Sequence, residues 1–78
     1  MEIIYYGRPN CGLCEEGKLM LQLVREDVPF GIKEVNIEDD DELHKKYMLM
    51  IPVVEKDGQI IQYGALDYVT LLEGIRGE

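Results

Sequence analysis

The sequence has few of the residues on which disulfide frameworks and metal sites depend. Its 78 residues include two cysteines, one histidine, three prolines and no tryptophan. Small secreted domains usually carry several widely spaced cysteines, and zinc sites need a full set of Cys, His or acidic ligands. The histidine, His44, falls among the charged residues of its segment and is expected at the surface. We therefore expect neither a disulfide framework nor a metal site.

Basic residues and long apolar runs are also scarce. Eight basic residues stand against 16 acidic ones, which gives a formal net charge of −8. This charge repels phosphate backbones and anionic lipids, so we expect no nucleic acid and no membrane partner. No apolar run approaches the roughly 20 residues of a bilayer span, and no basic segment precedes the first apolar stretch. We expect a cytoplasmic protein whose acidity serves solubility or selects partners with basic surfaces.

The length limits how the chain is organised. Seventy-eight residues make one domain, over residues 1–78, and such a domain buries only about 60% of its unfolded surface. The sequence contains no repeat, linker or low-complexity stretch. We expect a single domain that acts as a monomer.

The first half of the chain alternates between strand and helix patterns. Residues 2–6 form a continuous apolar run, which suits a strand that is buried on both faces. A helix is predicted from Leu13 to near Asp27, with Pro29 as its stop. Residues 32–37 alternate as a half-buried strand. The apolar positions of the helix are Leu13, Met20, Leu21, Val24 and Val28.

The second half adds a helix, a hairpin and a last helix. An acidic start over residues 39–42 suits a helix N-terminus, and strands over 52–55 and 59–63 are joined by a two-residue turn. The last helix follows Gly64. The inward positions of the two helices are Leu43, Tyr47 and Met50, then Leu66, Val69, Leu72 and Ile75.

The predicted order is β-α-β-α-β-β-α, an α/β fold. The first βαβ unit gives two parallel strands through a right-handed crossover, and the hairpin adds antiparallel strands. Helices that fall between strands cover both faces of the sheet. We expect a four-stranded mixed sheet with three helices.

Both cysteines lie in the segment Cys11-Gly12-Leu13-Cys14, between the first strand and the first helix. A disulfide across two residues closes almost no loop, so it contributes little to stability through chain entropy. Cys11 is expected at or next to the helix N-cap, where free N–H groups and the helix dipole favour a thiolate. Arg8 adds positive charge, whereas Glu15 and Glu16 project into solvent.

The spacing gives the two thiols different roles. Cys11 is exposed and attacks a substrate disulfide, and Cys14, one turn further and deeper, attacks Cys11 to release the reduced substrate. Leu13 is either part of the first-turn core or an exposed apolar contact for the substrate. Cys-x-x-Cys beside a βαβ pattern is a thioredoxin-like redox signature. The sequence therefore predicts a thiol–disulfide oxidoreductase that acts on protein or small-molecule disulfides.

Nearly the whole chain resembles the glutaredoxin family, and in particular its short bacterial glutaredoxin-like branch. Three blocks carry the likeness, at residues 6–14, 51–54 and 63–67. The resemblance implies a thioredoxin fold, a cis peptide bond before Pro52 beside the cysteines, and a backbone contact from Ile51 to an extended substrate. It also implies substrate binding through Gly64 and Asp67. Arg8 is a further candidate for substrate binding, because its positive charge locally offsets the acidity of the chain.

Two departures from the family pattern bear on glutathione. Glutaredoxins usually have Pro-Tyr between the cysteines, where this chain has Gly12-Leu13, and a Gly-Gly pair where it has Tyr63-Gly64. A side chain at Tyr63 blocks the close approach of a ligand or displaces the loop. We expect no cofactor and only weak use of glutathione as a co-substrate, so the reductant is unknown.

Two other uses of the same cysteines are alternatives. A copper chaperone has a similar length, and two thiolates suit soft Cu(I), but that fold needs two strands between its helices. An iron–sulfur carrier would assemble a cluster between two subunits with glutathione as a ligand.

Overall fold

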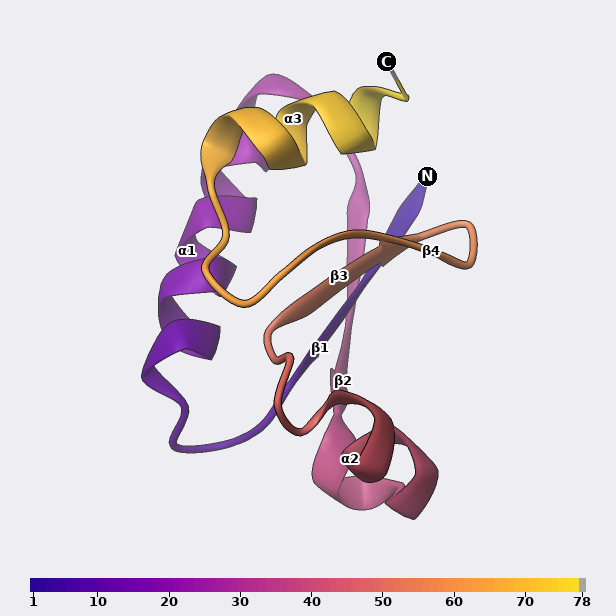
Figure 1. Cartoon of the computed structure of the whole chain (residues 1–78). Coiled ribbons are helices and arrows are strands. Elements are labelled where there is room, and N and C mark those ends of the chain that lie inside the picture. The colour runs from indigo at the N-terminus through magenta and orange to yellow at the C-terminus, as the bar shows by residue number, and fades with distance from the viewer. Residues whose placement is uncertain (78) are drawn as a thin grey trace.

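The computed structural model describes residues 1–77, which form four strands, three α-helices and one 3₁₀ turn. Figure 1 shows their arrangement. The strands and α-helices follow one another along the chain in the predicted order. In chain order the elements are β1 Glu2–Gly7, α1 Gly12–Asp27, β2 Gly31–Asn36, η1 Ile37–Asp39, α2 Asp41–Tyr47, β3 Val53–Lys56, β4 Gln59–Tyr63 and α3 Tyr68–Arg76.

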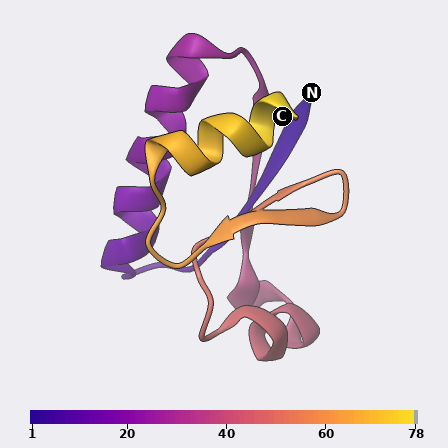
Figure 2. The same ribbon diagram turned by 45° about the horizontal axis from the view of Figure 1, so that its top comes forward.

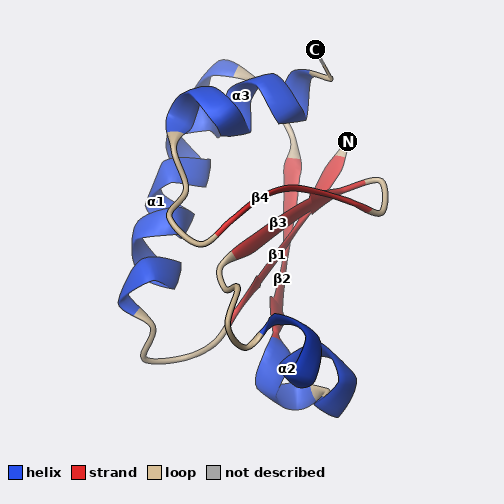
Figure 3. Ribbon diagram, viewed as in Figure 1, coloured by secondary structure: helices blue, strands red, loops and turns tan. Residues whose placement is uncertain are grey.

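The strands form one mixed sheet in the order β2-β1-β3-β4. β1 and β2 are parallel, as α1 requires, whereas β1–β3 and β3–β4 are antiparallel. Figure 3 shows the sheet between its helices. Since β1 and β3 run in opposite directions, the end of β1 and the start of β3 lie at the same end of the sheet. The predicted four-stranded topology is confirmed.

The sheet separates two apolar clusters because successive side chains of β1 point to opposite faces. Ile3 and Tyr5 pack with residues of α1 and α3, and Tyr6 packs on the other side with Tyr47 of α2. Figures 1 and 2 show α1 and α3 side by side on one face and α2 apart from them. The predicted coverage of both faces is correct.

Local signals fix the element ends. Asp57 and Gly58 both have positive φ, 52° and 79°, as a two-residue hairpin turn requires. The Asp40 side chain accepts the N–H groups of Glu42 and Leu43 and so caps α2. None of the described helices is long and apolar enough to cross a bilayer.

One predicted apolar position is wrong, and two others lie outside the helices to which they were assigned. Met50 lies beyond the end of α2 and Leu66 before the start of α3, although both pack against the apolar clusters as predicted. In α3 the buried residues are Leu71 and Ile75, four positions apart on one face, whereas Val69 is exposed. Val69 lies two positions before Leu71, which turns its side chain toward the far side of the helix.

The second strand also differs from its expected range. β2 ends at Asn36, whose side-chain oxygen accepts the N–H of Glu38 and starts the 3₁₀ turn. Ile37 is therefore not a strand residue, although its side chain is buried.

Candidate functional site

Cys11 and Cys14 are joined by a disulfide, with their Cα atoms 5.2 Å apart. Cys11 is the N-cap residue of α1 and has extended backbone angles, φ −120° and ψ 108°. Its Sγ accepts the backbone N–H of Cys14 at 3.1 Å. Asn10, with φ 57°, makes the turn that brings the chain from β1 into this cap. The sulfur of Cys11 thus sits among the free N–H groups of a helix N-terminus.

Cys14 is the deeper of the two cysteines. Only 6% of it is exposed, and it packs in the cluster that contains Tyr6 and Ile51, while Cys11 is half-buried at the edge of that cluster. Gly7 leaves room for the Cys14 side chain, because a Cβ on Gly7 would lie 3.3 Å from the Cys14 Sγ. The predicted difference in depth between the two thiols is therefore correct.

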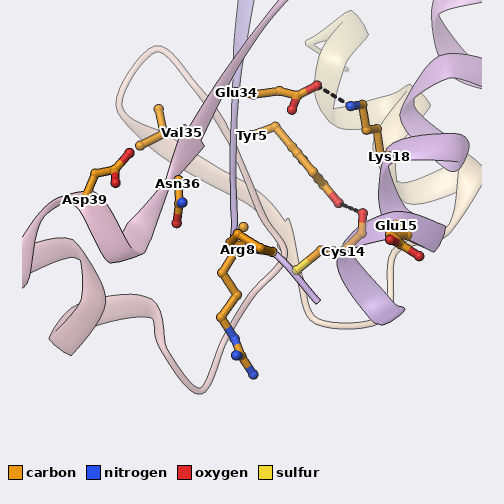
Figure 4. Close-up of a pocket in the computed structure, with 11 residues that line it drawn as sticks. Tyr5, Arg8, Cys14, Glu15, Lys18, Glu34, Val35, Asn36 and Asp39 are labelled. Atoms are coloured by element: carbon orange, nitrogen blue, oxygen red, sulfur yellow. Dashed lines mark hydrogen bonds and ion pairs between the residues drawn. The ribbon is translucent and has the colours of Figure 1, made fainter. Parts of the chain in front are cut away.

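A buried tyrosine lies beneath the first turn of α1. The Tyr5 hydroxyl donates a hydrogen bond to the Cys14 carbonyl (Figure 4). Burial raises the pKa of Tyr5 above its ordinary value, and the nearby Glu34 carboxylate raises it further. The hydroxyl therefore stays protonated and remains a donor, which holds the backbone at Cys14 against the sheet.

Gly17 is a site residue that the sequence analysis missed. A Cβ at this position would lie 2.7 Å from the Tyr5 Oη, 2.8 Å from the Leu66 Cδ1 and 3.0 Å from the Pro52 Cγ. A glycine therefore lets α1 approach both the sheet and the two loops beside the cysteines. The available signal was a glycine in the middle of an amphipathic helix, where it lowers helix propensity and calls for a packing reason.

The Ile51–Pro52 peptide bond is cis, as predicted. Pro52 is fully buried, and Ile51 packs in the same cluster as Cys14, so the bond lies beside the cysteines. The Ile51 N–H, however, donates to the Tyr47 carbonyl at 3.0 Å. The predicted backbone contact between Ile51 and a substrate can therefore use only the Ile51 carbonyl.

The backbone N–H of Gly64 contacts the segment around the cis peptide bond. The φ of Gly64 is 74°, and its N–H lies 2.9 Å from the Met50 carbonyl and 2.8 Å from the Pro52 carbonyl. The Gly64 amide is thus committed to the segment around the cis bond. Tyr63, immediately before it, is 56% exposed.

Asp67 caps α3. One carboxylate oxygen accepts the Thr70 N–H at 2.8 Å, and the other accepts the Gln62 amide at 2.8 Å. The Asp67 N–H in turn donates to the Gln62 side chain at 3.0 Å. The hydrogen bond from Thr70 is the main reason that the pKa of Asp67 lies below its usual value. Both oxygens therefore already have partners within the chain.

Arg8 borders a hollow of about 450 Å³ on the β2 side of Cys14. Its guanidinium group points away from Tyr5 and Cys14 (Figure 4), so its charge does not lie against the Cys14 sulfur. Across the hollow, Lys18 and Glu34 form an ion pair of 2.7 Å between α1 and β2. Among residues 1–77, no group of three or more His, Cys, Asp or Glu side chains is placed to hold a metal ion.

The sequence profile of the glutaredoxin-like domain family (DUF836) matches residues 2–76. The chain belongs to this family. A search of curated proteins finds no match. Together with the disulfide-bonded Cys11–Cys14 pair, membership makes this a glutaredoxin-like protein of the thioredoxin-fold superfamily.

Solved structures agree with that assignment. The structural genomics target XcR50 from X. campestris is 25% identical, with a TM-score of 0.85 and 97% of each chain covered. Protein Ne2328 from Nitrosomonas europaea is also 25% identical, with a TM-score of 0.77 over 90% of this chain and 85% of that one. Thioredoxin 1 from Thermosipho africanus is 15% identical, with a TM-score of 0.66 over 99% and 92%, and shows the fold.

The copper chaperone alternative does not fit this glutaredoxin-like fold. Such a chaperone needs two strands between its helices, and the chain has β2 followed by a 3₁₀ turn between α1 and α2.

Proposed function

We propose that this protein is a thiol–disulfide oxidoreductase in which Cys11 is the nucleophile and Cys14 the resolving thiol. The observation that carries the proposal is the position of Cys11 at the N-cap of α1, with the Cys14 N–H 3.1 Å from its sulfur. In the reduced protein the same N–H and the helix dipole stabilise a thiolate. The reduced Cys11 thiol is therefore expected to have a pKa below the usual value of about 8.5.

The reaction proceeds in two exchanges. The Cys11 thiolate attacks one sulfur of the substrate disulfide, a Cys11–substrate disulfide forms, and the other substrate sulfur leaves as a thiolate. Cys14 then gives up its proton and attacks the Cys11 Sγ, which releases the second substrate thiol. The protein is left with the Cys11–Cys14 disulfide, and an external dithiol or two monothiols reduce it again.

The segment before Pro52 supports this assignment because Ile51 packs in the same cluster as Cys14, and in this proposal the Ile51 carbonyl accepts a hydrogen bond from an extended substrate. Protein disulfides and small disulfides are both candidate substrates. Glutathione is a weak co-substrate in this proposal, since Tyr63 is exposed where a ligand would approach and both Asp67 oxygens are engaged. We place the protein in the cytoplasm as a monomer, where reducing thiol pools restore such a pair.

The proposal is tested by insulin reduction with dithiothreitol, using the wild type, Cys11→Ser and Cys14→Ser. The wild type is expected to accelerate precipitation of the insulin B chain, and Cys11→Ser to lose the acceleration completely. Reduced Cys14→Ser, freed of dithiothreitol and then mixed with insulin, should instead accumulate a mixed disulfide on Cys11 that is visible by mass spectrometry. Equal residual activity of the two variants, or no acceleration by the wild type, would remove the proposal.

A further inference from the structure

An apolar groove lies between α1 and the connection from β4 to α3. Its volume is about 340 Å³, and its lining includes Leu13, which stands between the two cysteines in the chain. Figures 1 and 2 show that the connection from β4 to α3 passes beside α1, and Leu66 of that connection lies against Gly17. The lining residues are Leu13, Glu16, Gly17, Leu19, Met20, Leu23, Ala65 and Leu66.

Three leucines of the groove are largely open to solvent. Leu13 is 49% exposed, Leu19 63% and Leu23 49%. Single exposed apolar residues are ordinary on protein surfaces, but these three line one hollow on one helix. Together they form an exposed apolar surface that a binding partner would bury.

The charges around the groove indicate what kind of molecule it binds. Glu16 is the charged residue of the lining, and Lys18, on another side of the same helix, is paired with Glu34. With a net charge of −8 on each chain, two copies repel each other. The complement of an apolar groove with an acidic side chain is an apolar segment that carries a basic residue.

We propose that the groove binds the substrate polypeptide of the redox reaction, through an apolar stretch with a basic residue next to the cysteine that Cys11 attacks. This inference rests on the proposed oxidoreductase function and names its substrate class. Leu13 of the groove lining stands between Cys11 and Cys14 in the chain, so a polypeptide whose disulfide reaches Cys11 comes close to one end of the set of lining residues on α1.

The length of the groove sets the length of the recognised segment. Leu13 and Leu23 are ten residues apart, which is about 15 Å along a helix at about 1.5 Å per residue. An extended peptide at about 3.3 Å per residue covers that distance with about five residues. The determinants therefore lie within about five residues on one side of the substrate cysteine.

The test uses synthetic peptides with one cysteine, each joined by a disulfide to thionitrobenzoate. Attack of the Cys11 thiolate on the peptide sulfur releases the coloured thionitrobenzoate thiolate, and a Cys11–peptide disulfide forms. Three peptides carry, on one side of the cysteine, leucines with an arginine, leucines with a glutamate, or serines with an arginine. Hydroxyethyl disulfide is the small reference substrate.

The variants are Leu23→Gln and Leu19→Gln, which keep a good helix former, and Glu16→Gln. Ile60→Thr on β4 is the control, because Ile60 is an exposed apolar residue outside the groove. Each rate is divided by the rate with hydroxyethyl disulfide, so that changes in thiol reactivity cancel. Circular dichroism verifies the fold of each variant.

The wild type should react about tenfold faster with the leucine–arginine peptide than with the serine–arginine peptide, which corresponds to about 1.4 kcal/mol. Leu23→Gln or Leu19→Gln should reduce that ratio several-fold, and Glu16→Gln should reduce the preference for arginine over glutamate. Ile60→Thr should leave both ratios unchanged.

Equal rates for the three peptides, or equal ratios in Leu23→Gln, Leu19→Gln and Ile60→Thr, would overturn the inference while reduction of hydroxyethyl disulfide still supported the redox function. A wild type that sediments as a dimer and becomes a monomer in Leu23→Gln would also overturn it, since a second copy would then fill the groove. Loss of reaction with every disulfide would instead refute the proposed function.

Discussion

At the scale of single residues, the site depends on glycines as much as on cysteines. Gly7 faces the Cys14 sulfur, and Gly17 faces Tyr5, Pro52 and Leu66. The sequence identified the cysteines because their spacing after a strand is informative in itself. It did not identify Gly17, because the reason for that glycine is a set of contacts with segments distant in the sequence.

Replacing Gly17 with alanine should destabilise the protein. The added Cβ would approach three groups within 3.0 Å, and such overpacking typically costs about 1–3 kcal/mol, against the roughly 1 kcal/mol that alanine gains in helix propensity. Urea denaturation measures the change. Gly12→Ala is the matched control, since its Cβ meets nothing within 4 Å, and its stability should be equal or higher. Equal stability of both variants would contradict the packing role of Gly17.

Replacing Tyr5 with phenylalanine should remove one donor from the Cys14 carbonyl. A typical net hydrogen bond contributes about 1 kcal/mol, and the Cys14 carbonyl, which lies inside α1, keeps its helical hydrogen bond. The apolar ring contacts remain. We expect lower stability in urea together with faster amide hydrogen exchange in the first turn of α1, and unchanged exchange there would show that the hydroxyl does not hold this turn.

At the scale of elements, periodicity and turn chemistry predicted most of the fold. The Asp57-Gly58 turn and the apolar run of β1 act locally, so the sequence was sufficient for them. The inward face of α3 depended on where the helix starts, which the Asp67 cap decides through its bond to Thr70. The hydrogen bond from the Ile51 N–H to the Tyr47 carbonyl was likewise not predictable, because it depends on how close the end of α2 lies to Ile51.

The Asp67 cap should make α3 sensitive to acid. The pKa of Asp67 is lowered in the folded chain, so its contribution to stability is present above the unfolded value of about 3.9 and is lost as the pH falls through the folded value. Asparagine caps helices comparably but carries no charge. The wild type should therefore lose more stability than Asp67→Asn between about pH 5 and pH 2. Parallel loss in both proteins, measured by thermal unfolding, would contradict this assignment.

At the scale of the whole molecule, we expect the acidic surface and the exposed Tyr63 both to disfavour glutathione, which is itself anionic. We expect glutathione-coupled disulfide reduction to be slow relative to insulin reduction with dithiothreitol, and Tyr63→Gly to raise the first rate more than the second. Rapid glutathione turnover that Tyr63→Gly does not improve and that Asp67→Ala abolishes would show that the loop binds glutathione conventionally.

The fold as a whole gives the two thiols different environments, and this difference is the central claim. The most direct measurement is the rate of alkylation of each thiol in the reduced protein by iodoacetamide, followed by peptide mass spectrometry from about pH 5 to pH 10. Cys11 should be modified first, with a midpoint below the ordinary thiol value of about 8.5, because the α1 N-terminus stabilises its thiolate. Earlier modification of Cys14, or a Cys11 midpoint at or above about 8.5, would contradict the account.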